Sequence, residues 1–288
     1  MSKNLLSVRD LSAEEILSLS SVGDHPSVGS GVLAMLFQQA SLRTMASFAI
    51  AGVKLGLTPV SISTTGGALR DQTDFEDELH QLSIMGARCI VTRSSKTFSR
   101  DDGRYRYPVP IINGGDGSNE HPTQALVDVA VIRNSGLDKR KMVMMGNLKS
   151  HRTTHSLALA LRHFDIDLCA VSPASLAMPQ SYTDNRVESV AADSAEEVDE
   201  VLCQADIVYI VPLSYYDFMN TEAVAAYSMS KERAERVLKK AAKIMHPFPR
   251  FAELDPLLDG SSYDLYHAQS SLGPAIRARV LSHLLHEA

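Results

Sequence analysis

The sequence contains little cysteine, with only Cys89, Cys169 and Cys203 among its 288 residues. Each cysteine lies in an apolar run, and their spacing is not that of a metal site. Reduced thiols inside a hydrophobic core explain such positions. We therefore expect no disulfide and no metal site from these residues.

Long apolar runs are also missing. Residues 1–17 carry charges throughout and lack the apolar core of a secretory signal, and no stretch approaches the roughly 18 apolar residues of a membrane span. The net charge of −6 argues against a nucleic-acid surface, which needs clustered positive charge. We expect a soluble cytoplasmic protein with no membrane or nucleic-acid partner. The net charge still allows locally basic pockets that bind small anions.

The composition that is present, 44% apolar and 22% charged, is that of a globular protein with one large domain or two. Apolar runs typical of buried strands alternate with segments of helical periodicity, which predicts an α/β fold with parallel sheets covered by helices. The strands are expected at 31–37, 59–62, 87–92, 110–112, 141–145, 166–171, 207–211 and 243–245. The helices are expected at 43–55, 74–85, 122–134, 153–164, 196–204, 231–239 and 274–286.

A domain boundary is indicated near 134–140, where NSGLDKR combines turn residues with charge. We expect one domain at 1–135 and a second at 136–273, with a ligand cleft between them. The final helix, within 274–288, has no strand after it and is expected to pack back on the first domain. Irregular stretches at 64–72 and 94–108 are expected to be functional loops.

The segment Ser41-Leu42-Arg43-Thr44 runs from a strand end into a helix start. Backbone N–H groups at a helix N-terminus favour phosphate. Hydroxyls of Ser41 and Thr44 and the guanidinium of Arg43 add donors. The alternative is that Ser41 caps the helix and Arg43 is solvated.

A second polar segment, the glycine-rich run 114–124, contains His121-Pro122-Thr123-Gln124. Pro122 suits a first helical turn, so His121 and Gln124 fall on one face and can address one small polar group. An imidazole and an amide fit a carbonyl and its attached nitrogen. The alternative is a histidine in an ordinary turn.

Together, residues 37–55 and 110–128 strongly resemble two signatures of the aspartate/ornithine carbamoyltransferase family, Ser-Thr-Arg-Thr and His-Pro-x-Gln. The resemblance continues in MMGNLKSHRTTHSL at 144–157 and in HPFPR at 246–250, which are closest to the aspartate branch. It covers nearly the whole chain in one order. It implies a homotrimeric carbamoyltransferase that binds carbamoyl phosphate and an amine substrate, with no metal and no cofactor.

The same resemblance implies roles for individual residues. The phosphate would be held by Ser41, the backbone of Leu42, Arg43 and Thr44. The catalytic groups around the carbamoyl carbonyl and amine would be Thr44, Arg93, His121 and Gln124. The acceptor would be bound by Arg152, Pro212, Ser214, Phe248 and Pro249.

Three departures from the family pattern bear on the substrate. Leu42 replaces a threonine, which removes a hydroxyl but keeps a backbone N–H. The loop 63–71, expected to enter a neighbouring subunit, lacks the family lysine; Arg70 either replaces it or pairs with a nearby aspartate. Pro212 and Ser214 stand where the family has an arginine and a glutamine that bind the aspartate side chain.

These departures predict an acceptor with one recognised carboxylate, bound by Arg152, and a less charged remainder near Tyr215 and Tyr216. The alternative is that the two tyrosines only contribute to packing. Three readings stay open. The first is a carbamoyltransferase with an acceptor other than plain aspartate. The second is a genuine aspartate carbamoyltransferase, and the third is a non-catalytic relative that binds ligand or a partner subunit.

Overall fold

The computed structural model describes residues 4–23, 26–63, 72–98, 107–137, 140–213 and 221–286. The chain divides into two compact units, one formed by 1–130 with 272–288 and the other by 131–271. Each unit contains one sheet whose strands all pair in parallel. The predicted α/β class is confirmed.

The first unit has the strand order β2-β1-β3-β4. Its strands are β1 (Val32–Phe37), β2 (Thr58–Ser63), β3 (Ala87–Ser94) and β4 (Ile111–Asp116). Its helices are α1 (Ala13–Leu19), α2 (Leu42–Lys54), α3 (Gln72–Ile84), α4 (Pro122–Asn134, mostly in this unit) and the later part of α9 (Tyr266–His286).

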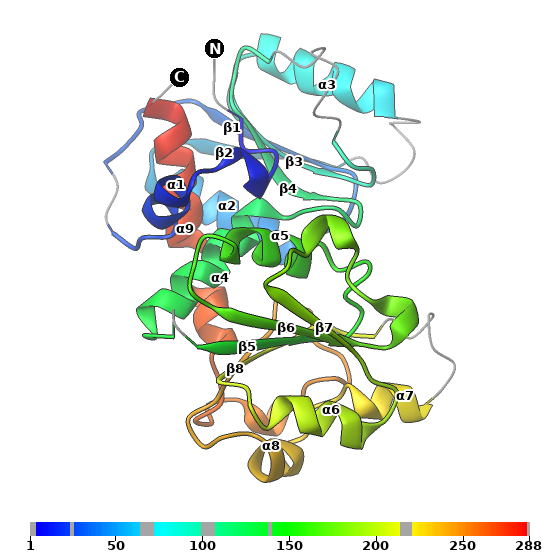
Figure 1. Cartoon of the computed structure of the whole chain (residues 1–288). Helices are drawn as coiled ribbons and strands as arrows, with labels where there is room; N and C mark the ends of the chain where they lie inside the picture. Colours follow the sequence, from blue (N-terminus) through cyan, green and yellow to red (C-terminus); the bar gives the residue numbers. More distant parts are fainter. Residues whose placement is uncertain are drawn as a thin grey trace. The chain divides into compact units, whose positions relative to one another are not determined.

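The apolar alternation of β1 explains how helices cover both faces of this sheet. Ala34 and Leu36 belong to a buried cluster with Phe75 and Leu79 of α3. Leu33 points to the opposite face, where a Cβ at Gly52 of α2 would lie 2.9 Å from its side chain. Helices α3 and α2 accordingly lie on opposite sides of the sheet (Figure 1).

The second unit has the strand order β7-β6-β5-β8-β9. Its strands are β5 (Lys141–Met145), β6 (Asp167–Ser172), β7 (Val187–Ala191), β8 (Ile207–Ile210) and β9 (Lys243–Met245). Its helices include α5 (Arg152–Leu161), α6 (Ala195–Leu202), α7 (Thr221–Ala226) and α8 (Lys231–Val237).

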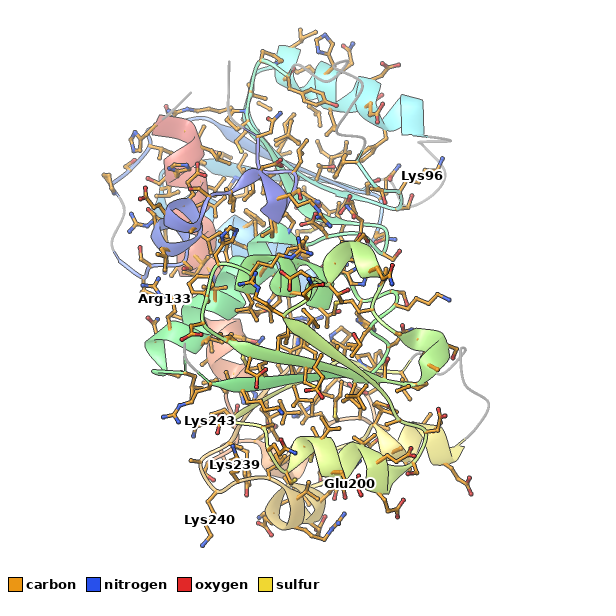
Figure 2. The ribbon with its side chains drawn as sticks, in the orientation of Figure 1. Lys96, Arg133, Glu200, Lys239, Lys240 and Lys243 are labelled. Atoms are coloured by element: carbon orange, nitrogen blue, oxygen red, sulfur yellow. The ribbon has the colours of Figure 1, made fainter. Side chains whose placement is uncertain are left out.

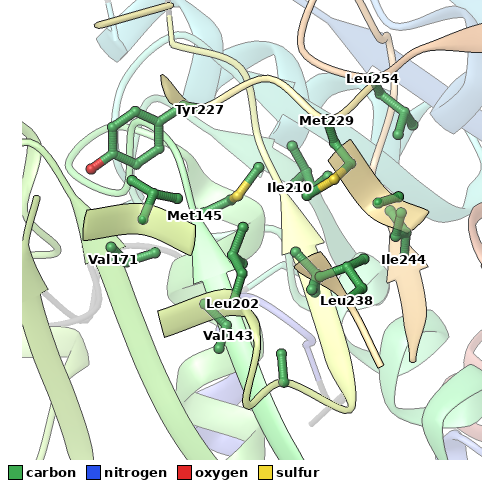
Figure 3. Packing of buried hydrophobic residues seen from close by; sticks show 14 of the residues in the cluster. Val143, Met145, Val171, Leu202, Ile210, Tyr227, Met229, Leu238, Ile244 and Leu254 are labelled. Carbon is green, nitrogen blue, oxygen red and sulfur yellow. The ribbon is translucent and has the colours of Figure 1, made fainter. Parts of the chain in front are cut away.

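A hydrophobic cluster joins the second sheet to the helices on one of its faces (Figure 3). Met145 and Ile210 of the central strands pack with Leu202 of α6 and Leu238, which follows α8. The buried Tyr227 contributes its ring and satisfies its hydroxyl by donating to the Ala192 carbonyl at 2.7 Å. Burial of these side chains supplies the main favourable term for folding of this unit.

Charged side chains lie on the surface of the second unit, where Glu200, Lys239 and Lys240 are labelled in Figure 2. Lys239 binds the carboxylate of Asp206 at 2.9 Å, while its neighbour Lys240 is exposed and points away from the protein. These lysines belong to the solvated surface of the second unit.

Two elements differ from their predicted bounds in a way that affects the site. Strand β4 was expected at 110–112 but runs through the glycines to Asp116. A Cβ at Gly114 would lie 3.1 Å from the Thr92 carbonyl oxygen, so close approach to β3 rather than a loop requires this glycine. Helix α9 begins at Tyr266, with Pro274 inside it, although the sequence placed its start at that proline.

Short elements escaped prediction. Strand β7 carries mostly exposed side chains at the sheet edge, so its sequence lacks a buried-strand pattern. Helices α1 and α7 are only 7 and 6 residues long, too short for a periodic signal.

Candidate active site

The phosphate segment predicted from the sequence forms the start of α2. Ser41 is the N-cap residue, yet its side chain makes no capping hydrogen bond. Its hydroxyl instead donates to Thr44 Oγ1 at 2.9 Å. Ser41 thus occupies the N-cap position without a side-chain capping bond, which leaves the first N–H groups of the helix for another acceptor.

Leu42 and Arg43 lie on the outer side of this helix start. The Leu42 side chain is 82% exposed, so only its backbone is suited to a ligand. Arg43 is also exposed at the surface, and partial burial lowers the pKa of its guanidinium, which stays cationic. The segment thus combines a helix N-terminus, a cation and a buried hydroxyl.

Thr44 joins this segment to the second predicted motif. Thr44 Oγ1 lies 3.3 Å from His121 Nε2, and both side chains are 4% exposed. His121 immediately precedes α4, so its ring stands at the N-terminal end of that helix. The structure therefore brings together two segments that the sequence separates by 77 residues.

Arg93 reaches the same place from β3. It pairs with Phe37 at the end of β1, and its Nη1 donates to the Gly114 carbonyl at 2.8 Å. Gly114 also lies beside Thr44, because a Cβ at this glycine would be 3.5 Å from the Thr44 methyl. Thr44, Arg93 and His121 thus converge where the carboxyl ends of β1, β3 and β4 meet, which is where ligands bind in parallel α/β sheets.

Gln124 completes the first group of predicted residues. It is half-buried in the first turn of α4, and its backbone N–H donates to the His121 carbonyl at 3.0 Å. Its side-chain Nε2 donates to Asp128 Oδ1 at 2.8 Å.

The acceptor residues predicted from the sequence lie in the second unit. Arg152 is the first residue of α5 and is half-buried. His155 supports this helix start, since its Nε2 contacts the Leu148 carbonyl at 2.8 Å and its ring stacks on Tyr182. The predicted Ser214 and Arg70, with Tyr215 and Tyr216, lie outside the described residues.

His151, which the sequence did not single out, forms a hydrogen bond with the backbone of Pro212. Because proline has no N–H, the imidazole must donate to its carbonyl. Burial, and then the neighbouring His246 and His155, lower the pKa of His151 to about 4. The ring beside Arg152 is therefore neutral at pH 7.

Phe248 and Pro249 follow a buried histidine. His246 Nδ1 accepts from the Phe248 N–H at 2.9 Å, so Nε2 carries the hydrogen that faces Glu253 at 2.9 Å. Phe248 adopts a φ of 52°, and its peptide bond to Pro249 is cis. A positive φ is uncommon for a residue with a Cβ, and such conformations cluster at ligand sites.

Arg250 is committed elsewhere. Its guanidinium binds both carboxylate oxygens of Asp259, through Nη1 and through Nη2 at 2.7 Å. This pairing lowers the pKa of Asp259 to about 2. Arg250 is thus already paired rather than poised for a substrate carboxylate.

This chain is similar to known proteins in sequence and in structure. Residues 3–134 match the family model described as "Aspartate/ornithine carbamoyltransferase, carbamoyl-P binding domain". The chain is 31% identical to the aspartate carbamoyltransferase catalytic subunit of Methanothrix thermoacetophila over 309 residues, which covers 99% of each chain. It is 30% identical to that of Archaeoglobus fulgidus, over 99% of this chain and 100% of the relative.

The chain belongs to the aspartate/ornithine carbamoyltransferase family. A crystal structure of aspartate transcarbamoylase from Trypanosoma cruzi with carbamoyl phosphate and aspartate is similar to it, with a TM-score of 0.84 and 26% identity. That comparison covers 98% of this chain and 95% of the other. The predicted family and the predicted carbamoyltransferase class of enzyme are confirmed.

Two buried carboxylates that the sequence analysis missed, Asp116 and Glu120, lie in the segment between Gly114 and His121 of the first unit. Asp116 accepts from Phe98 N at 2.9 Å and Glu120 N at 3.0 Å. Glu120 binds the Ser7 hydroxyl and accepts from Val8 N at 2.9 Å. Burial raises the pKa of both carboxyls. Their spacing of four residues within the glycine-rich segment was the available signal.

Within the described ranges, no group of three or more His, Cys, Asp or Glu side chains has the arrangement of a metal site. In the same ranges, no helix is long and apolar enough to cross a membrane.

Proposed function

We propose that this carbamoyltransferase moves the carbamoyl group of carbamoyl phosphate to an amine that carries one recognised carboxylate, and that aspartate is a poor acceptor. The observation that carries the first part is the convergence of Thr44, Arg93 and His121 around Gly114.

The phosphate group would bind at the start of α2. The first N–H groups of the helix and the Ser41 and Thr44 hydroxyls offer hydrogen bonds, and Arg43 offers a cation. Leu42 would contribute its N–H alone, because its side chain is exposed.

The carbamoyl carbonyl would then lie among Thr44, Arg93 and His121. The amine nitrogen attacks the carbonyl carbon and forms the new C–N bond, and the C–O bond to phosphate breaks. Donors aimed at the carbonyl oxygen stabilise the negative charge that develops there. The departing phosphate takes the proton of the amine, so the side chains need to position rather than to deprotonate.

The acceptor preference rests on the charges of the second unit. Arg152 can bind one carboxylate. Pro212 has no side-chain donor, its neighbour His151 is neutral, and Arg250 is held by Asp259. A second carboxylate buried beside these groups would lack compensation, which costs several kcal/mol in effective terms.

The second candidate is a genuine aspartate carbamoyltransferase. It is favoured by the names of the relatives, which are aspartate carbamoyltransferase catalytic subunits. In that case Arg70 of a neighbouring subunit in a homotrimer would supply the missing cation.

The two candidates are separated by carbamoylation of a panel of amines with radiolabelled carbamoyl phosphate. The proposal expects an amine with a single carboxylate or a neutral side chain to give a higher kcat/KM than aspartate. If aspartate is the best acceptor, the second candidate replaces the first.

A further inference from the structure

Behind the proposed carbamoyl site, α4 carries a buried carboxylate. Asp128 is 0% exposed and accepts from Gln124 Nε2 at 2.8 Å. An ionised carboxylate accepts hydrogen bonds but cannot donate them. An ionised Asp128 therefore holds the NH₂ end of the Gln124 amide and directs the amide oxygen away from itself.

A buried cation on α9 matches this carboxylate. Arg277 is 4% exposed. Burial lowers the pKa of Arg277 to about 10, and the negative charge of Asp128 acts in the opposite direction, so Arg277 remains a cation at neutral pH. Its guanidinium carbon lies 5.3 Å from the centre of the Phe48 ring of α2, a cation–π arrangement.

Gly273 leaves space for the side chain of Arg277. A Cβ at Gly273, one turn before Arg277, would lie 2.7 Å from Arg277 Nη1 and 3.8 Å from the Ser47 Cβ of α2. Arg277 thus contacts α2 through Phe48, while the negative charge of Asp128 on α4 acts on its guanidinium.

The amide orientation matters because the carbamoyl group has two ends. Its carbonyl oxygen needs donors, which Thr44, Arg93 and His121 offer. Its NH₂ needs an acceptor. The side-chain oxygen of Gln124 can accept a hydrogen bond from the carbamoyl NH₂. It faces the carbamoyl group only while the NH₂ of Gln124 is turned toward Asp128.

We propose that Asp128 and Arg277 are positioning residues: Asp128 fixes the Gln124 amide with its oxygen toward the carbamoyl NH₂, and the buried Arg277 cation stabilises the negative charge of Asp128. This inference rests on the proposed carbamoyl phosphate site. The competing explanation is that Gln124 and Asp128 are an ordinary pair four residues apart that stabilises α4.

Calorimetry with two ligands distinguishes these explanations. Inorganic phosphate lacks the carbamoyl group, so its binding reports on the fold and the phosphate site alone. In Asp128→Asn, Arg277 attracts the new amide oxygen, the new NH₂ faces Gln124, and the Gln124 amide must turn. We expect carbamoyl phosphate to bind about 10- to 100-fold more weakly, with phosphate binding unchanged.

Exchanging the amide of residue 124 and the carboxylate of residue 128 should restore the binding of carbamoyl phosphate. In the double variant Gln124→Glu/Asp128→Asn, one Glu oxygen accepts from the Asn NH₂ and the other faces the carbamoyl NH₂, while Arg277 keeps one carboxylate nearby. Gln124→Glu alone places two carboxylates together and should bind carbamoyl phosphate as weakly as Asp128→Asn.

Two variants test Arg277. Arg277→Met should bind carbamoyl phosphate as weakly as Asp128→Asn, and Arg277→Lys, which keeps the charge, should bind it as tightly as the wild type.

The outcomes separate this inference from the proposed function. Wild type that binds no carbamoyl phosphate would overturn both. Wild type that binds it, with Asp128→Asn unchanged, would overturn the positioning role alone. The same holds if the double variant is no better than the single variants, or if phosphate binding weakens in parallel with carbamoyl phosphate binding.

Discussion

The Thr44 hydroxyl oxygen lies 3.3 Å from Nε2 of His121, and Ser41 donates to the same oxygen at 2.9 Å. This contact links the N-terminal ends of α2 and α4, which carry the two motifs of the first unit. One hydroxyl therefore connects the group proposed to hold phosphate with the ring proposed to face the carbonyl.

Removal of this hydroxyl should slow catalysis without unfolding the protein. Thr44→Val keeps the shape of the side chain but loses a donor to the developing oxyanion. We expect kcat to fall roughly 100-fold, as for other oxyanion donors. Thr58→Val, on the exposed side of β2, is the matched control and should leave kcat unchanged. A variant at Thr44 with wild-type kcat would remove Thr44 from the catalytic group.

Arg43 should contribute to phosphate affinity rather than to the carbamoyl contacts. Arg43→Ala loses a charge-assisted interaction, so carbamoyl phosphate and inorganic phosphate should both bind about 10- to 100-fold more weakly. Arg236→Ala, which removes a surface arginine that pairs with Asp199, should change neither affinity. Calorimetry with both ligands checks this, and unchanged phosphate binding by Arg43→Ala would contradict it.

Acid should destabilise the protein through His151. Its pKa is about 4 in the folded protein, against 6.5 for an ordinary histidine. Between these values the unfolded chain binds more protons than the folded one, so the free energy of unfolding falls as pH decreases from about 6.5 to about 4. The loss from pH 7 to pH 5 should be roughly 1 to 2 kcal/mol, allowing for water around the half-buried ring.

Urea unfolding at the two pH values measures this loss. His151→Asn retains a donor for the Pro212 carbonyl but does not titrate, so its stability should depend less on pH. His163→Asn, an exposed histidine, serves as the control and should keep the pH dependence of the wild type. Equal pH dependence in His151→Asn and wild type would show that other groups govern acid sensitivity.

The sequence predicted the elements whose boundaries carry strong local signals. Helix α4 and strand β5 have the predicted bounds, since Pro122 marks the first helical turn and Lys141 begins an isolated apolar run. Contacts between distant segments could not be predicted in this way. The hydrogen bonds of Glu120 with Ser7 and Val8 span more than a hundred residues, and no local pattern encodes such a partner.

The same limit applied to the acceptor residues. The resemblance predicted Pro212 as an acceptor residue. The hydrogen bond from His151 to the Pro212 carbonyl forms only when the start of α5 and the end of β8 come together in the fold. Arg250 follows Phe248 and Pro249 in the chain and could be taken from the sequence for a cation at the acceptor site, but its pairing with Asp259 is visible only in three dimensions.

Oligomeric state provides a further prediction. The family resemblance implies a homotrimer in which the loop 63–71 of one subunit completes the site of the next. Sedimentation should show a trimer, and Arg70→Ala should lower kcat/KM without dissociating it. A fully active monomer would exclude a shared site.

The last prediction concerns the acceptor. Pro212 stands where the family pattern has an arginine that binds the aspartate side chain. In this protein Pro212 offers its backbone carbonyl, which accepts a hydrogen bond from His151. Pro212→Arg keeps that carbonyl and adds a cation near Arg152, so a second carboxylate would gain a partner. Pairing a carboxylate that is otherwise uncompensated is worth several kcal/mol in effective terms, and each 1.4 kcal/mol changes a rate about tenfold. We therefore expect kcat/KM for aspartate to rise about 10-fold or more, with little change for an amine that has one carboxylate.

The control is Pro212→Met, which is similar in length but uncharged and should not produce this gain. The comparison is made by steady-state carbamoylation of both amines. If Pro212→Arg lowers aspartate use below that of the wild type, the cation for the second carboxylate comes from another residue, and Arg70→Ala in the same assay would identify it.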